Sequence, residues 1–501
     1  MPTTLPTISA TDNSVIDEVL VLGFALDKKS KKFSILSGEL RVDQGPLLQA
    51  LTDLGASGAS DEVIKLPGSA SKLILLTALT LKADGSIAHE VLRRAAGAAA
   101  RSLAGTTSAT FALPQASKQD FQAIAEGALL GAYTFDEFRG SSKADRKPAL
   151  KKVTIYSKKA KDKSYLQGIK RAEIIAKYTH LTRDLINTPP SHLTPDSFSQ
   201  RFKKLATSLG VKVEILNESQ LIKGGYGGII GVGQGSANPP RLLRLSYSGK
   251  GAKKRYAFIG KGITFDTGGL ALKPAQGMEA MKSDMSGAAA VCAAVLAIAE
   301  LKLPIHIDAW AALAENMVSD KATRPSDIIT IYGGKTVEVL NPDAEGRLVL
   351  ADAMVRAAEV GKKAGGLDGM VDVATLTGAQ VVALGTRTSA VMTNNESFRE
   401  QFLTLAEITG EAFWPMPLPE ELRASLDSPV ADMANIGDRM GGMLVAGLFL
   451  KDFVDSELPW LHLDIAGPAY NEAKAHGYTP VGGTGVALRT LVALAESSAA
   501  K

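Results

Sequence analysis

The sequence predicts an α/β protein of two domains, and three observations support this prediction. The chain has 501 residues, more than one ordinary hydrophobic core contains. Short apolar runs typical of buried strands alternate with Ala-rich helical stretches, which favours sheets covered by helices. A long helical stretch that ends at a double proline separates the first third of the chain from the rest, and it indicates a connection between two domains.

Residues 1–162 are predicted to form the first domain. Val15–Ala25 and Lys72–Leu79 are short apolar runs bounded by polar residues, so they predict buried strands. His89–Leu103 and Lys118–Tyr133 are rich in alanine and predict helices. Strands that alternate with helices favour an α/β domain.

Residues 143–163 carry nine Lys or Arg and two Asp, which gives a local charge of +7. One interpretation is a patch that binds nucleic acid. The other is a solvated edge strand and linker, which we favour because charge runs are usually exposed. Neither aromatic interleaving nor a nucleic-acid motif supports the first interpretation.

Residues 163–186 predict a helix that connects the two domains, because apolar side chains recur there at helical spacing. The run stops at Asn187-Thr-Pro-Pro190, where two prolines prevent its continuation. A second α/β domain is predicted over residues 187–501.

The composition is 45% hydrophobic and 22% charged, which excludes a disordered or fibrous chain. The net charge of +4 is too small to indicate nucleic-acid or membrane binding by itself. The single cysteine, Cys292, excludes an internal disulfide and a thiolate metal cluster. We expect neither a signal peptide nor an apolar run of about 18 residues, so a cytoplasmic protein without a membrane segment is predicted.

Several familiar catalytic motifs are absent from the sequence. Its six histidines form no H-E-x-x-H pair, and it contains no G-x-S-x-G elbow. The runs Gly231–Gly235 and Gly260–Gly262 lack the spacing of dinucleotide and phosphate loops, so they predict tight turns.

The first stretch that could form part of a functional site is Tyr256–Gly269. Its residues 256–259 predict a buried strand followed by a glycine-dense turn. Glycines around Lys261 and Asp266 let the backbone approach an ion or ligand closely. The carboxyl ends of strands are where open α/β sheets bind ligands. Lys273 follows on the next loop.

Two further stretches place carboxylates at the starts of predicted helices. Asp284 precedes a helix predicted for Ala288–Glu300, where a lone Asp is usually a cap. Asp343 and Glu345 lie two residues apart on a turn between a strand and a helix, so both carboxylates can face one point. A cap for that helix, with Arg347 as their ion-pair partner, is the alternative explanation.

These stretches together indicate a two-metal site. The four carboxylates are those of Asp266, Asp284, Asp343 and Glu345. Two divalent cations would neutralise their four charges, which would otherwise raise one another's pKa values and destabilise the fold. Oxygen ligands suit Mn²⁺, Mg²⁺ or Zn²⁺, and paired ions of this kind promote hydrolysis.

Asn341-Pro-Asp-Ala-Glu-Gly-Arg-Leu348 resembles the signature octapeptide of the leucyl aminopeptidase family, the cytosolic aminopeptidases of peptidase family M17. The resemblance covers residues 180–501 and includes Asn187–Pro190, Gly260–Pro274, Met281–Gly287, Glu315–Met317, Ala374–Gly378, Ala431–Gly437, Leu461–Gly467 and Gly482–Gly485. It implies two domains, each a mixed twisted sheet flanked by helices. The first is a variable, macro-like domain and the second is catalytic.

The resemblance implies two divalent metal ions, Mn²⁺ or Zn²⁺, in each subunit. Asp266 and Glu345 would bridge the two ions. Asp343 would complete one site, and Lys261 and Asp284 would complete the other. A lysine ligand must be a neutral amine, so the adjacent cations would have to lower its pKa.

The implied reaction is hydrolysis of the N-terminal residue, leucine and other mainly apolar residues, from peptides with a free N-terminus. Lys273 would hydrogen-bond the oxyanion of the gem-diolate intermediate. Arg347 would hold a bicarbonate ion as general base, because its planar fork matches oxyanions. Met281, Thr375 and Ala466 would line the pocket for the first side chain or pack in the core, and the subunits would form a homohexamer.

The sequence departs from the family pattern at two positions. Pro342 replaces the usual Thr of the octapeptide and removes a backbone donor, and Ser191 replaces the usual Asn after the double proline.

Two other functions compete with the aminopeptidase. A two-metal phosphoesterase would not need Lys273, and a DNA-binding accessory role has only the segment 143–163 as local support.

Overall fold

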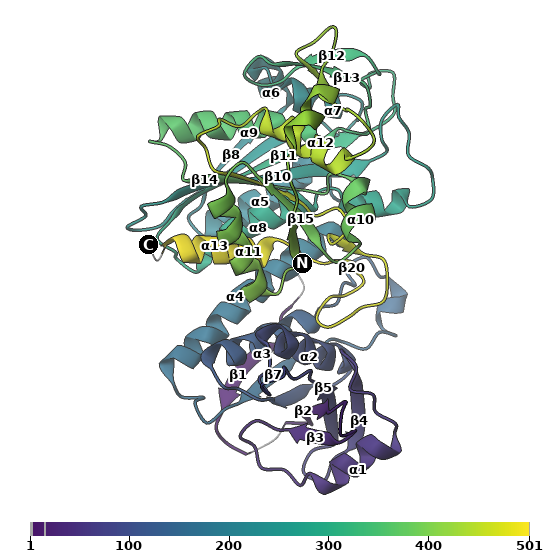
Figure 1. Cartoon of the computed structure of the whole chain (residues 1–501), viewed down its shortest axis with the longest axis vertical. Coiled ribbons are helices and arrows are strands. Elements are labelled where there is room, and N and C mark those ends of the chain that lie inside the picture. Colours follow the sequence, from purple (N-terminus) through teal and green to yellow (C-terminus); the bar gives the residue numbers. More distant parts are fainter. Residues whose placement is uncertain (1–3, 15–16, 500–501) are drawn as a thin grey trace. The chain divides into compact units, whose positions relative to one another are not determined.

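The computed structural model describes residues 4–14 and 17–499 (Figure 1). They form two compact units, and each unit is described by itself. Unit 1 comprises the residues up to Leu181 together with Ala473–Val481, and unit 2 comprises Thr182–Glu472 and the residues from Gly482 onwards. The predicted connecting helix is present as α4 (Lys163–Asn187), and the boundary between the units falls within it. The predicted domain limits stay a prediction.

Unit 1 is a seven-stranded mixed sheet with helices. The strand order is β1-β7-β6-β2-β5-β4, with β3 paired to β2; β3 and β4 run antiparallel to their neighbours. The elements are β1 (Thr7–Thr11), β2 (Val19–Leu26), β3 (Phe33–Leu36), α1 (Gly45–Asp53), β4 (Val63–Pro67), β5 (Leu73–Ala78), α2 (His89–Ser102), β6 (Ser108–Ala112), α3 (Lys118–Gly131), the 3-10 turn η1 (Ser141–Lys143) and β7 (Lys152–Tyr156).

The strands and helices predicted for the first domain are confirmed apart from their ends. The strand predicted to begin at Val15 begins at Val19 in β2; residues 15 and 16 lie outside the described residues. The helix predicted for Lys118–Tyr133 ends at Gly131.

The prediction of an edge strand within residues 143–163 is wrong. Strand β7 lies between β1 and β6, and its residues 153–156 are buried. Lysines at its start and on both sides obscure this short apolar run in the sequence, and several of them pair with aspartates. Lys152 Nζ lies 2.9 Å from an oxygen of Asp17, and Lys161 Nζ lies 2.7 Å from an oxygen of Asp12.

A late segment of the chain completes unit 1. Tyr478 packs on Gly97 of α2, where a Cβ atom would come within 2.5 Å of the Tyr478 Cβ. The Tyr478 hydroxyl donates to Glu90 at 2.8 Å, and Arg101 Nε donates to the carbonyl of Gly477 at 3.3 Å. Residues 473–481 therefore contribute to the packing of α2.

Unit 2 contains an eight-stranded sheet of order β16-β15-β18-β14-β10-β11-β9-β8. Its central strands β18, β14, β10 and β11 run parallel, so their carboxyl ends meet at one edge. The strands are β8 (Lys212–Leu216), β9 (Arg241–Ser248), β10 (Arg255–Asp266), β11 (His306–Asn316), β14 (Gly369–Ala374), β15 (Ser389–Thr393), β16 (Phe413–Pro415) and β18 (Trp460–Asp464).

Helices cover both faces of this sheet, with α7, α9 and α12 on one face and α8, α11 and α13 on the other (Figure 1). The helices are α5 (Pro195–Ser208), α6 (Glu218–Gly224), α7 (Gly227–Gly233), α8 (Ser286–Glu300), α9 (Gly346–Lys363), α10 (Gly378–Leu384), α11 (Glu396–Thr409), α12 (Gly442–Lys451) and α13 (Leu488–Ala499), with 3-10 helices η2 (Met278–Ser283) and η3 (Glu420–Leu426). Small sheets add β12 (Asp327–Thr330), β13 (Thr336–Val339), β17 (Met433–Ala434), β19 (Tyr470–Asn471) and β20 (Gly482–Gly483).

The glycine-dense turn predicted after residue 259 is wrong, because β10 continues to Asp266. Gly260 lies where α8 crosses the sheet, and a Cβ atom there would be 2.4 Å from the Cα of Ala288. The glycine therefore permits close packing of a helix on a strand. The turn comes after the strand, at Gly268 and Gly269, whose φ angles are 85° and 60°.

One helical segment of the described residues, Met278–Glu300, is long and apolar enough to cross a membrane. Of the window that meets this test, 94% is buried inside the protein. It packs on β10 and β11, as expected of a core helix.

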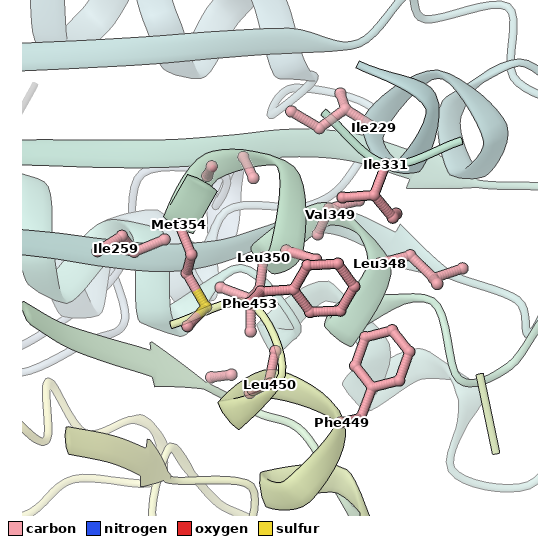
Figure 2. Packing of buried hydrophobic residues seen from close by; sticks show 14 of the residues in the cluster. Ile229, Ile259, Ile331, Leu348, Val349, Leu350, Met354, Phe449, Leu450 and Phe453 are labelled. Carbon is pink, nitrogen blue, oxygen red and sulfur yellow. The ribbon is translucent and has the colours of Figure 1, made fainter. Parts of the chain in front are cut away.

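Helix α9 anchors the core on the opposite face of the sheet. Figure 2 shows Leu350 and Met354 of this helix among the side chains of α12 and its neighbours. Within this cluster Asp352 is fully buried and accepts hydrogen bonds from the backbone N–H groups of Ile229 and Tyr332, both at 2.7 Å. Burial raises the pKa of Asp352 to about 7, although these N–H groups oppose the shift.

The buried carboxyl of Asp352 predicts a pH-dependent stability. An unfolded Asp ionises near its ordinary pKa of 3.8, whereas folded Asp352 keeps its proton to about pH 7. Its favourable contribution is therefore complete below pH 3.8 and is lost as the pH rises to about 7. Asp352→Asn cannot ionise, so its thermal midpoint should rise relative to that of the wild type by at least about 2 °C between about pH 4 and pH 8.

The control for this experiment is Asp320→Asn, which changes an exposed carboxyl. Its midpoint should keep a constant difference from the wild type over the same pH range. A pH-independent difference for Asp352→Asn would contradict the prediction.

The close approach of α8 to β10 predicts that Gly260→Ala is destabilising. The new methyl group meets the backbone of Ala288, which cannot rotate away, and overpacking of this kind costs about 1–3 kcal/mol. A scanning calorimetry measurement should show a lower thermal midpoint. Gly378→Ala is the control, because Gly378 lies in helix α10 and nothing lies within 4 Å of its Cβ position; equal midpoints for the two variants would refute the argument.

Candidate metal centre

A cavity of about 720 Å³ lies in unit 2 at the edge where β10 and β14 end. All seven residues singled out as metal ligands or catalytic groups line it: Lys261, Asp266, Lys273, Asp284, Asp343, Glu345 and Arg347. The three residues predicted for the side-chain pocket, Met281, Thr375 and Ala466, line the same cavity. Parallel strands explain this convergence, because their carboxyl ends share one edge of the sheet.

Three carboxylates from two separate elements meet in this cavity. Asp266 is the last residue of β10, whereas Asp343 and Glu345 belong to the turn that leads into α9. One oxygen of each lies within 4.8 Å of the others. Asp284, at the end of η2, is joined to this group through a lysine.

Two lysines bridge the carboxylates. Lys261 Nζ lies 2.8 Å from Asp284 Oδ2 and 2.8 Å from Glu345 Oε1, and its side chain is buried. Lys273 Nζ lies 2.9 Å from Asp266 Oδ2 and 2.5 Å from Asp343 Oδ1. Lys273 is less enclosed, with 22% of its side chain exposed, so its ammonium group faces the cavity from the loop after β10.

The helix-cap explanation of these carboxylates is wrong. Glu345 is the N-cap residue of α9, yet its side chain makes no capping hydrogen bond. Met285, not Asp284, is the N-cap residue of α8. The alternative ion pair with Arg347 is also wrong. Among the described residues Glu345 and Asp343 pair with Lys261 and Lys273 and not with Arg347, whose Nη1 donates to the carbonyl of Asn435 at 2.8 Å.

The crowding of charge shifts the pKa values of the cluster. Burial, together with the charge of Asp266, raises the pKa of both Glu345 and Asp284. Burial alone would lower the pKa of Lys261, but the carboxylates of Asp284 and Glu345 outweigh it and raise that pKa. These buried carboxylates therefore require nearby cations to offset their negative charge.

The donor atoms fit divalent metal ions. Four buried oxygens, namely Asp284 Oδ2, Asp343 Oδ1 and both oxygens of Glu345, accept no hydrogen bond from the described part of the chain. Three of them lie at ion-pair distance from a lysine ammonium group, but the angles are not those of a hydrogen bond. Buried carboxylate oxygens with free lone pairs are the ligands that Mg²⁺, Mn²⁺ and Zn²⁺ accept.

The sequence patterns did not single out the residues that orient these ligands. Asn316, at the end of β11, donates from Nδ2 to Asp266 Oδ1 at 2.9 Å and to the carbonyl of Pro342 at 3.1 Å. Asn435 accepts on Oδ1 from the N–H groups of Leu340 and Asn341 at 2.8 and 3.1 Å. Both asparagines lie in segments that resemble the family, which was the available signal.

Thr375 has contacts beyond those of a pocket wall. Its hydroxyl donates to Asp284 Oδ1 at 2.7 Å, and its carbonyl accepts from Lys261 Nζ at 2.8 Å. Of the two departures from the family pattern, Pro342 is buried in the turn and Ser191 is exposed, with its hydroxyl 2.9 Å from His192 Nδ1.

Comparison with known proteins places both parts of the chain in one family. The model of the cytosol aminopeptidase family catalytic domain matches residues 180–492, and the model of its N-terminal domain matches residues 24–142. A probable cytosol aminopeptidase of Streptomyces avermitilis is 52% identical over 513 residues, covering 99% of each chain. A second of this name, from Nocardia farcinica, is 47% identical over 97% of this chain and 95% of its own length.

Solved structures agree with these matches. The bottromycin maturation enzyme BotP in complex with Mn is 35% identical, with a TM-score of 0.84 over 96% of this chain and 99% of that chain. Another BotP structure is 34% identical, with a TM-score of 0.83 over 97% of this chain and 100% of that chain. With both domains matched and relatives half identical over its full length, the chain belongs to the cytosol aminopeptidase family, a family of metal-dependent aminopeptidases.

Proposed function

We propose that this chain hydrolyses the N-terminal residue of peptides, with leucine and other mainly apolar residues preferred, at two divalent metal ions. The observation that carries the proposal is the group of Asp266, Asp343 and Glu345 in one cavity with two lysines. Membership of the family supplies the reaction class. When bound, the two ions would polarise the scissile carbonyl and acidify the attacking water.

The proposed ligands divide into two sets that share Asp266 and Glu345. Asp343 completes one set, and Lys261 with Asp284 completes the other. The 2.8 Å separations of Lys261 Nζ from Asp284 and Glu345 support the second set. Lys261 must lose its proton to act as a ligand, and a nearby divalent ion favours that loss. The structure of BotP in complex with Mn supports Mn²⁺, and Zn²⁺ suits the same donors.

Lys273 is proposed to stabilise negative charge on the carbonyl oxygen during attack. The carboxylates of Asp266 and Asp343 outweigh the effect of burial and raise its pKa, so Lys273 is a cation at neutral pH. A fixed ammonium group in a partly closed cavity interacts more strongly with developing charge than water does. Its 22% exposure leaves it accessible to a bound peptide.

Arg347 is proposed to hold bicarbonate, which would accept a proton from the attacking water. Burial lowers the pKa of Arg347 to about 10, so the guanidinium stays charged at neutral pH. Its Nε has no hydrogen-bond partner among the described residues, and the residue lines the cavity. A planar fork with a free donor matches a planar oxyanion.

The proposed preference for leucine-like residues rests on the wall of the cavity. Met281 and Ala466, with Met278 and Val445, give this wall apolar side chains that suit an aliphatic side chain. A homohexameric assembly and a cytoplasmic location are also proposed. The first is implied by the resemblance, and the relatives' name, cytosol aminopeptidase, supports the second.

Among the described residues nothing favours the phosphoesterase, and the ion pairs of the basic segment weaken the local support for DNA binding. The basic segment is engaged in part, since Lys143, Lys152 and Lys161 lie within ion-pair distance of Asp residues in unit 1. The family match covers the whole cavity, which favours peptides over phosphate esters.

Removal of a shared ligand should abolish metal-dependent activity. Glu345→Gln keeps the size of the side chain but removes its charge. Hydrolysis of leucine p-nitroanilide should then fall by more than the roughly 10–100-fold typical of losing an outer partner of a metal ligand. The assay compares chelator-treated protein with protein resupplied with Mn²⁺ or Zn²⁺.

Two controls accompany the Glu345→Gln assay. Glu396→Gln changes a glutamate whose side chain is 68% exposed and should behave as the wild type. An N-acetylated substrate should not be cleaved, because the proposal requires a free amine. Metal-independent release by the wild type would refute the two-metal proposal.

A base held by Arg347 predicts that activity depends on bicarbonate. Addition of bicarbonate to carbonate-free buffer should raise the kcat of the wild type. Arg347→Ala should lose both this response and about 10²–10⁴-fold of the rate, the usual contribution of a general base. Arg347→Lys keeps a charge without the fork and should respond weakly. A response to bicarbonate that persists in Arg347→Ala would exclude this role.

A further inference from the structure

Asp464 is a buried carboxylate that the proposed reaction does not use. It is the last residue of β18 and is fully buried. Its oxygens accept three hydrogen bonds, on Oδ1 from the N–H groups of Leu376 and Ala466 at 3.1 and 3.2 Å, and on Oδ2 from the hydroxyl of Thr377 at 2.7 Å. A buried carboxylate whose hydrogen bonds all come from neutral donors is costly, so its position invites an explanation.

The three donors belong to the two loops that follow β14 and β18. These strands are parallel neighbours, with Ala374 opposite Asp464, so both loops leave the sheet at the edge of the cavity. Leu376, Thr377 and Ala466 all line that cavity. Asp464 therefore ties together two segments of its wall.

A second link closes the connection between these loops. Gln380 Oε1 accepts from the N–H of Gly467 at 2.7 Å, and the Gln380 N–H donates to the hydroxyl of Thr377 at 3.1 Å. Gln380 Nε2 also donates to the carbonyl of Thr388 at 2.6 Å. Thr377 is thus held from both sides, which leaves the first loop little freedom.

The first loop contacts the proposed ligands directly. Thr375 stands one residue before Leu376, and its carbonyl and hydroxyl contact Lys261 and Asp284, respectively. On the other side of the site, Asn316 holds Asp266 and Asn435 holds the turn that carries Asp343. The loop therefore acts on one ligand set of the two.

The link uses both oxygens of the Asp464 carboxylate as acceptors. Three donors converge on the two carboxylate oxygens, and each oxygen accepts at least one hydrogen bond. An Asn side chain that keeps its oxygen on the two N–H groups would turn its NH₂ group toward the Thr377 hydroxyl, which could then no longer donate to residue 464 and would have to reorient. The substitution is nearly isosteric, so it weakens the link without opening a cavity.

We propose that Asp464 is a positioning residue that fixes Thr375 against Lys261 and Asp284, and thereby sets the metal affinity of that ligand set. The proposal rests on the two-metal function above. It assigns Asp464 no contact with substrate.

The test measures binding of Mn²⁺ to the metal-free full-length protein by calorimetry and by the paramagnetic resonance signal of free Mn²⁺. The wild type should bind two ions. In Asp464→Asn one affinity should fall, by at most the roughly 10–100-fold typical of losing a direct outer partner of a metal ligand, because Asp464 acts on the ligands through Thr375, while the second affinity stays unchanged. Excess Mn²⁺ should restore kcat toward the wild-type value.

Matched variants separate positioning from a loss of stability. Asp372→Asn changes a buried carboxylate on the neighbouring strand, which binds Trp460 Nε1 at 2.7 Å and His462 Nδ1 at 2.6 Å, and it should leave both Mn²⁺ affinities unchanged. Thr377→Val removes one donor to Asp464 and should weaken the same single affinity. Thr377→Ser keeps the hydroxyl and should restore it. If Asp464→Asn does not fold, the Thr377 pair carries the test.

The outcomes are distinguishable. Unchanged affinities in Asp464→Asn and Thr377→Val, or equal weakening of both affinities, would overturn the positioning role while the two-metal function stands. A wild-type protein that binds no Mn²⁺ would instead overturn the proposed function itself.

Discussion

Negative charge buried at the carboxyl end of β10 is the constraint on which the rest of the catalytic unit depends. Asp266, Asp343 and Glu345 lie within reach of one another in a cavity walled by protein, where like charges repel strongly. Lysines and donor side chains offset that repulsion in part. The rigid parallel strands on one side and the packed core of α9 on the other hold the carboxylates in place, so the repulsion does not relax by movement.

The polar side chains around the cluster match the hydrogen-bond donors and acceptors of the groups that surround them. Asn435 stands where the backbone offers both donors and acceptors, and its amide satisfies both. Asn316 donates to the Asp266 carboxylate and to the carbonyl of Pro342. Asp352 and Asp464 stand where only donors converge, and a carboxyl group accepts from all of them. The polar core is therefore specified as closely as the apolar one.

Much of this site could be predicted, because its ligands lie at strand ends and in a short octapeptide that carries most of the chemistry. The residues that orient them could not be derived from local pattern, since the contacts of Asn435 with residues 340 and 341 span about a fifth of the chain. Local patterns were also misleading at three elements. Gly231 and Gly233, predicted to form a tight turn, lie in helix α7. Gly260 indicated a turn, although the glycine serves a helix that crosses the strand, and the lysines around β7 concealed an interior strand.

The late segment at residues 473–481 gives the protein an unusual order of assembly during synthesis. The packing around Gly97, Glu90 and Arg101 requires Gly477 and Tyr478, which the ribosome adds only after nearly all of unit 2. At about 20 residues per second or slower, this segment follows Leu181 by about 15 s or more. During synthesis, one face of α2 in the first unit therefore stays uncovered until residues 473–481 have been added.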